Sequence, residues 1–112
     1  MNTRKDSISM KAALLLLLPL SVSAADTEFN LTIKDHRFQP TELTVPADKK
    51  VKLVVENQDA TPEEFESHSL NREKVITGNS EAIIHIGPLE PGRYPFFGEF
   101  NQATAQGVIV AK

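Results

Sequence analysis

Residues 92–110 read GRYPFFGEFNQATAQGVIV, and this segment is the most informative part of the chain. It begins with the aromatic run Tyr94 to Phe97 and ends with the β-branched run Val108 to Val110, two kinds of residue that favour β-strands. Gly98 follows the first run and Gly107 precedes the second. The segment therefore predicts two strands joined by a loop at the C-terminal end of the chain.

The rest of the chain carries the same kind of pattern. Apolar and polar residues alternate over 28–33, 51–56 and 81–86, which is the period of a half-buried strand, and Leu43 and Val45 form a shorter run. Residues 73–76 fit either a strand end or a loop, and no long amphipathic helix, repeat or second domain is evident. Short strands at this spacing predict an all-β, Greek-key β-sandwich of about seven short strands.

The N-terminal residues 1–25 have the three parts of a secretory signal peptide. A basic segment ends at Lys11, an apolar run extends from Ala12 to Leu20, and small residues follow up to Ala25. The apolar run is too short to cross a bilayer. We predict cleavage after Ala24 or Ala25, export to the periplasm of a bacterial cell, and a single domain over 26–112 that does not insert into the membrane.

The composition limits what this domain can do. Removal of residues 1–25 takes away three basic residues and one acidic residue, which changes the net charge from −3 to −5. An acidic domain lacks the basic patch that nucleic-acid binding requires, so no nucleic-acid partner is expected. The chain has no Cys, and both Met residues lie in the predicted signal peptide. Roughly 87 residues remain, enough for one core that is stabilised by packing alone.

The C-terminal segment resembles the copper-binding end of the cupredoxins, in which an aromatic strand leads to a Cys, a His and a Met ligand. Here Gly98 stands at the Cys position, Asn101 at the His position, and Thr104 or Ala105 at the Met position. A type-1 copper centre depends on a thiolate and two imidazoles. The resemblance therefore implies a cupredoxin-like fold with no type-1 copper.

The resemblance extends over the whole of 26–112. Phe38-Gln39-Pro40, the run 43–48 and the loop Asn57-Gln58-Asp59 match the cupredoxin pattern in order and spacing. In copper-binding members this loop leads to the first His ligand. Here glutamate occupies that place, and Glu63 and Glu64 compete for it because the loop length is uncertain by one residue.

Glu-Phe-Glu-Ser at 64–67, together with Phe-Phe-Gly-Glu-Phe at 96–100, is similar to one branch of the superfamily. That branch comprises the periplasmic cupredoxin-like proteins of bacterial ferrous-iron transport systems, some of which carry His where this chain has Asn101. It implies an accessory role in iron, or iron and copper, acquisition beside an iron permease or a periplasmic metal-binding partner protein. Oxidation of ferrous iron would need an electron acceptor, and we predict a binding protein rather than an enzyme.

The candidate metal ligands are carboxylates and imidazoles. Glu64 and Glu66 lie two residues apart, so both leave the same face of a strand, where a cation would relieve their repulsion. Glu99 lies in the loop after the aromatic run, and the resemblance places His36 at the same end of the sandwich. These four are the predicted ligands of an iron or copper ion, and the secondary candidates are Glu63, His68 and Asn101.

Each candidate also has a simpler interpretation, because a Glu-rich strand face or a turn His is commonly just solvated surface. The main alternative is thus a metal-free cupredoxin-like protein-interaction module of a periplasmic transport or redox complex. A third interpretation is a copper chaperone, although such proteins often use Met ligands and the predicted mature chain has none.

Overall fold

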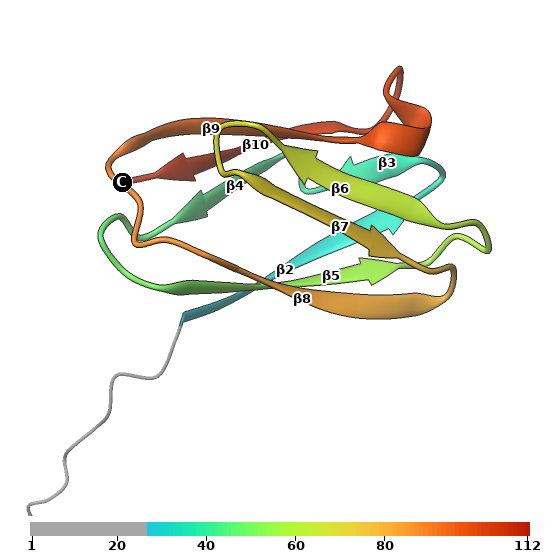
Figure 1. Ribbon diagram of the computed structural model, residues 1–112, viewed down its shortest axis with the longest axis horizontal. Helices are drawn as coiled ribbons and strands as arrows, with labels where there is room; N and C mark the ends of the chain where they lie inside the picture. The colour runs from blue at the N-terminus through green and yellow to red at the C-terminus, as the bar shows by residue number, and fades with distance from the viewer. Residues whose placement is uncertain (1–26) are drawn as a thin grey trace, which may run out of the picture.

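This computed structural model describes residues 27–112, and the predicted signal peptide lies outside them. The described chain forms nine strands, labelled β2 to β10, and one short 3₁₀ helix, η2 (Figure 1). The strands are β2 (Thr27–Lys34), β3 (Arg37–Gln39), β4 (Glu42–Val45), β5 (Val51–Asn57), β6 (Glu63–Ser67), β7 (Arg72–Ile76), β8 (Ser80–Ile86), β9 (Gly92–Gly98) and β10 (Gln106–Ala111), with η2 at Glu99–Asn101. No helix within residues 27–112 is long and apolar enough to span a membrane.

The strands form two sheets that face each other across one core. The larger sheet has the order β4-β10-β9-β6-β7, and the smaller has the order β3-β2-β5-β8. Two neighbouring pairs, β10 with β4 and β2 with β5, are parallel, and the other pairs are antiparallel. The predicted β-sandwich is confirmed, with more strands than the sequence indicated.

Two strands with weak sequence patterns lie at sheet edges: β3, which the sequence did not indicate, and β7, where the pattern fits either a strand end or a loop. β7 shows no alternation because only Ile76 of its five residues is buried. β3 is three residues long and pairs with β2 through a tight turn in which Asp35 and His36 have positive φ angles of 53° and 58°. An edge strand with so little buried surface leaves a weak hydrophobic pattern in the sequence.

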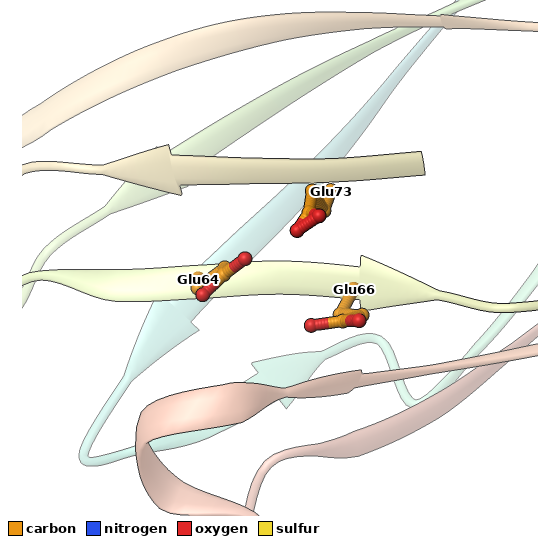
Figure 2. A group of neighbouring side chains, drawn as sticks. All are labelled: Glu64, Glu66 and Glu73. Atoms are coloured by element: carbon orange, nitrogen blue, oxygen red, sulfur yellow. The ribbon is translucent and has the colours of Figure 1, made fainter. Parts of the chain in front are cut away.

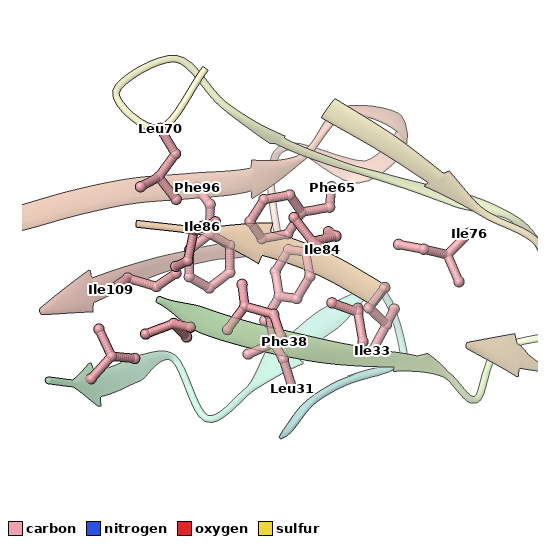
Figure 3. Close-up of a cluster of buried hydrophobic side chains, with 14 of the residues drawn as sticks. Leu31, Ile33, Phe38, Phe65, Leu70, Ile76, Ile84, Ile86, Phe96 and Ile109 are labelled. Atoms are coloured by element: carbon pink, nitrogen blue, oxygen red, sulfur yellow. The ribbon is translucent and has the colours of Figure 1, made fainter. Parts of the chain in front are cut away.

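The core lies between the sheets and centres on three phenylalanine rings (Figure 3). Phe65 of β6 stacks on Phe96 of β9 with ring centroids 5.0 Å apart, and Phe38 of β3 meets Phe96 edge-on at 4.9 Å. All three side chains are at most 1% exposed, and burial of each contributes about 2–3 kcal/mol. The aliphatic residues around them include Leu31, Ile33, Leu53, Val55, Ile76, Ile84, Ile86 and Ile109.

One end of the sandwich brings together the β2–β3 turn, the β5–β6 connection and η2 (Figure 1). The Asp59 carboxylate accepts hydrogen bonds from the amides of Asp35 and His36 at 2.8 and 3.0 Å. The Thr104 hydroxyl donates to the carbonyl of His36. We call this the loop end, and these bonds hold its three segments together.

A buried asparagine shapes the connection that leads into β6. The side-chain amide of Asn57 donates to the carbonyls of Thr61 and Ile76 at 2.9 and 3.1 Å, and its oxygen accepts from the amide of Asp59 at 3.0 Å. These bonds hold the β5–β6 connection in a fixed position, so β6 begins in a fixed register. That register determines which side chain of β6 faces the loop end.

Candidate functional site

Strand β6 carries the candidate site because its two faces present different chemistry. Glu63, Phe65 and Ser67 face inward and are 2%, 0% and 1% exposed, whereas Glu64 and Glu66 face outward and are partly exposed. β6 lies between β7 and β9 in the larger sheet. Glu63 is thus a carboxylate in a row of core-facing side chains.

The Glu63 carboxylate is held by three N–H donors. Its Oε1 accepts from the amide of Phe100 at 2.8 Å and from the amide of Glu64 at 3.0 Å. Its Oε2 accepts from the side-chain amide of Asn101 at 2.8 Å. Both oxygens of the carboxylate act here only as hydrogen-bond acceptors. We call this carboxylate and its three donors the Glu63 clamp.

The loop from Gly98 to Ala105 is packed closely around the clamp. A Cβ at position 98 would lie 2.6 Å from Cδ of Glu63 and 2.7 Å from Cβ of Ala105, so a side chain there does not fit. The amide of Gly98 donates to the carbonyl of Ala105 at 2.9 Å, and the amide of Ala105 donates to the carbonyl of Asn101 at 2.8 Å. Close packing therefore explains why position 98 is a glycine, since its backbone φ of −94° is accessible to any residue.

The residues at the loop end do not fit a type-1 copper ion. The positions that the resemblance matched to copper ligands do converge, but they hold Glu63, Gly98, Asn101 and Ala105. Glu63 supplies a carboxylate, Gly98 no side chain, Asn101 an amide whose N–H group donates a hydrogen bond, and Ala105 a methyl group. Glu63 is also the glutamate that faces the loop end, while Glu64 points outward.

The outward face of the larger sheet carries a group of three carboxylates (Figure 2). Glu64 and Glu66 come from β6, and Glu73 comes from β7, directly opposite Glu66 in the strand register. One ligand oxygen from each of the three lies within 4.8 Å of the others. We call this group the outer triad. Its geometry would allow a cation to contact all three carboxylates.

Desolvation and neighbouring carboxylates raise the pKa of Glu64 above its ordinary value of 4.5. Desolvation is the largest cause, and the charges of Glu66, Glu73 and Glu99 add to it, together with a hydrogen bond to Glu73. Ionisation of Glu64 is therefore less favourable in the folded protein than in the unfolded chain.

The other predicted ligands lie outside the outer triad. Glu99 lies in η2, where its carboxylate accepts from the side-chain amide of Gln102 at 3.3 Å. His36 is exposed in the β2–β3 turn, and the His68 ring lies 5.5 Å from the ring of Phe97. Within residues 27–112, the only group of three or more metal-ligating side chains contains neither histidine nor Glu99. Their assignment as metal ligands stays a prediction.

Sequence reasoning misses two residues that the structure brings into these sites. Glu73 lies in a segment whose pattern fits either a strand end or a loop, although a hairpin built symmetrically on residues 67–72 places it beside Glu66. Asp59 lies in a loop that the sequence indicates only as a turn. Its role depends on hydrogen bonds from the amides of His36 and Asp35, which lie 23 and 24 positions earlier in the chain. The hydrogen bond from the His36 amide is the main cause of the lowered pKa of Asp59, and no local pattern signals that bond.

Comparison with known proteins places this geometry in a family. The model of the cupredoxin-like domain family matches residues 7–111. Uncharacterized protein RP394 of Rickettsia prowazekii (strain Madrid E) is 48% identical over 83 residues, which cover 74% of this chain and 66% of that protein. The chain thus spans slightly less than two thirds of the length of this curated relative.

Solved structures share the fold at low sequence identity. Auracyanin A, a blue copper protein from Chloroflexus aurantiacus, superposes with a TM-score of 0.68 at 16% identity, covering 79% of this chain and 100% of that chain. The metal-binding domain of the Cu(I)-exporting P-type ATPase CopA of Streptococcus pneumoniae D39 gives 0.64 at 14%, covering 82% and 91%. Amicyanin from Paracoccus versutus gives 0.58 at 17%, covering 81% and 85%.

Proposed function

Because the chain belongs to the family of cupredoxin-like domains, we propose that it is an exported module of this fold that binds a cation on its outer face. The cation-binding residues are Glu64, Glu66 and Glu73, and the biological role is an accessory one in iron acquisition. Export follows from the signal peptide expected at residues 1–25. The partner we propose is an iron permease or a periplasmic metal-binding protein.

The outer triad is the observation that carries this proposal. Three carboxylates within 4.8 Å of one another repel. Desolvation is the largest cause of the raised pKa of Glu64, and this repulsion adds to it. A cation between them would remove the repulsion and gain three anionic oxygen ligands. The free energy of crowding in the metal-free protein thus becomes part of the affinity for the cation.

The chemistry of the ligands favours iron over cuprous copper. Carboxylate oxygens suit hard cations, whereas cuprous copper prefers thiolate and thioether ligands. Glu99 and His68 are predicted ligands on the neighbouring segments, and they are the candidates to complete the coordination. This donor set is consistent with ferric or ferrous iron as cargo held at an exposed face and passed to a partner.

Metal titration of the mature protein tests the proposal. Ferrous iron is added without oxygen, and ferric iron and cupric copper are added in air, with binding followed by calorimetry and the bound metal counted after desalting. We expect stoichiometric binding of iron by the wild type and a loss of at least tenfold in affinity in Glu64→Gln/Glu66→Gln.

The matched control is Glu56→Gln/Glu81→Gln, which removes two carboxylates that lie directly opposite each other on the smaller sheet. It changes the net charge by the same amount and should leave the affinity unchanged. Equal weakening in both double variants would mean that only the overall charge attracts the ion, and the outer triad would lose its role.

A second candidate function is a metal-free interaction module, and the Glu63 clamp favours it. The clamp closes the loop end without any ion, so the fold does not need one. On this alternative the wild type binds none of the three ions, and the acidic face docks on a protein partner. In the native host, the wild type should then restore a deletion strain and Glu64→Ala/Glu66→Ala should not. Equal restoration by both would show that the acidic face is dispensable for docking.

A further inference from the structure

The Glu63 clamp links two parts of the chain that are far apart in sequence. Its carboxylate sits at the first residue of β6, and two of its three donors, the amide of Phe100 and the side chain of Asn101, lie 37 and 38 residues later. A metal ion at this end of a cupredoxin-like fold would make the same kind of link between a strand and the loop after β9. Here a side chain of the protein makes it.

The close packing and the hydrogen bonds of the clamp argue against an ion inside the loop end. The carboxylate carbon would lie 2.6 Å from any Cβ at position 98, and both carboxylate oxygens are already engaged. All three groups directed at the carboxylate are N–H donors, which cannot serve as metal ligands in that form. The interior of the loop end is therefore closed to cations.

The same three bonds determine where two outward carboxylates lie. The amide of Glu64 is bonded to Oε1 of Glu63, which fixes the backbone from which the Glu64 side chain departs. The amide of Phe100 is bonded to the same oxygen, and this holds η2 and thus Glu99 beside β6. The inward carboxylate therefore sets the spacing between the outward ones.

We propose that Glu63 is a positioning residue that takes the place of a metal ion. Its carboxylate cross-links β6 to η2, shuts the loop end to cations, and holds Glu64 and Glu99 where a cation can bind on the outer face. The positioning of Glu64 and Glu99 rests on the proposed function, whereas the cross-link and the closure of the loop end do not.

The test compares Glu63→Gln with Ser67→Ala. Glu63→Gln keeps the size of the side chain but turns one oxygen into an N–H donor that meets another donor, so part of the clamp is lost. Ser67→Ala removes other hydrogen bonds of β6 without touching the clamp. The Ser67 hydroxyl donates to the carbonyl of Pro95 in β9 at 2.7 Å and accepts from the amide of Leu70 at 3.2 Å. The pair separates loss of the clamp from general destabilisation.

Two measurements are made on each variant: hydrogen exchange of the Phe100 amide by NMR, and iron affinity by calorimetry. In Glu63→Gln we expect exchange of the Phe100 amide to accelerate about tenfold and iron affinity to fall about fivefold, although no outward carboxylate has changed. In Ser67→Ala both quantities should stay at their wild-type values.

Unchanged exchange in Glu63→Gln would overturn the cross-link, and faster exchange with unchanged affinity would overturn the positioning role. If the wild type binds no iron, the proposed function and the positioning clause both fail, and the exchange measurement still decides the cross-link. Iron bound by the Glu64→Gln/Glu66→Gln variant as tightly as by the wild type, but lost in Glu63→Gln, would place the ion inside the loop end and overturn its closure.

Discussion

The side chain of Asn101 donates a 2.8 Å hydrogen bond to the buried carboxylate of Glu63. These two residues stand at the positions matched to the imidazole ligands of copper-binding cupredoxins, and here they are paired with each other. The pair is the reason that this end of the sandwich is ordered without an ion. Its energetic weight follows from the burial of Glu63, which is 2% exposed.

Glu63→Ala should cost about 3 kcal/mol of unfolding free energy, because it leaves three N–H donors without their acceptor and opens a cavity. Glu63→Gln should cost about 1–2 kcal/mol, since one oxygen still accepts. Urea denaturation followed by circular dichroism measures both. A loss of less than about 0.5 kcal/mol of unfolding free energy in Glu63→Ala would contradict a structural role for the clamp.

Gly98→Ala should destabilise the protein by about 2 kcal/mol, because the new methyl group overlaps the carboxylate of Glu63. In the background of Glu63→Ala the overlap with the carboxylate is gone, and only the close approach to Cβ of Ala105 at 2.7 Å remains. The same methyl group should therefore cost less there, with a coupling energy of about 1 kcal/mol or more. Urea denaturation of the two single variants and the double variant completes the cycle. Additive effects would show that the two side chains do not share this space.

Glu64→Gln should stabilise the protein at neutral pH, and this advantage should shrink as the pH falls. The raised pKa of Glu64 means that the folded protein binds a proton more tightly than the unfolded chain. Ionisation of Glu64 therefore lowers stability as pH rises from its ordinary pKa of 4.5 through the raised value, and the full cost is present above that value. Thermal unfolding of the wild type and Glu64→Gln at about pH 4 to pH 8, which covers the titration of Glu64, gives the difference in stability directly. A constant difference across the range would contradict the prediction.

Asp59→Asn should remove an acid-dependent contribution to stability. The amides of His36 and Asp35 lower the pKa of Asp59 below its ordinary value of 3.8, so the ionised form is favoured in the folded protein. This contribution is fully present above pH 3.8 and is lost as the pH falls through the lowered folded pKa. The wild type should therefore lose stability more steeply than Asp59→Asn below that pH. Parallel acid-unfolding curves, followed by circular dichroism, would argue against the bond between Asp59 and the β2–β3 turn.

Strong periodic patterns predicted the fold, and weak ones failed at its edges. The alternation in residues 51–56 and 81–86 corresponds to β5 and β8, and the β-rich runs around Phe96 and Ile109 correspond to β9 and β10. The pattern in residues 73–76 does not decide between a strand end and a loop, because only Ile76 of β7 faces the core. An edge strand whose residues are otherwise solvated has too weak an alternation to be identified with certainty from the sequence.

The candidate site was predictable in its residue types but not in its geometry. The spacing of Glu64 and Glu66 indicated one shared face, and both belong to the outer triad. The inward direction of Glu63 depends on the register in which β6 enters the sheet, which the buried side chain of Asn57 fixes. A bond that spans 38 residues, such as that between Glu63 and Asn101, has no local signature.

The missing side chain at position 98 also has a consequence for the history of this fold. A thiol introduced there alone would meet the carboxylate of Glu63, and an imidazole introduced at position 63 alone would have no thiolate to join it in binding copper. Passage between this protein and an electron carrier of the same architecture therefore requires coordinated exchanges on two strands, with a less stable intermediate between them. The carboxylate clamp and a copper centre are thus alternative ways of closing the same end of the sandwich, and the overlap between positions 63 and 98 separates them.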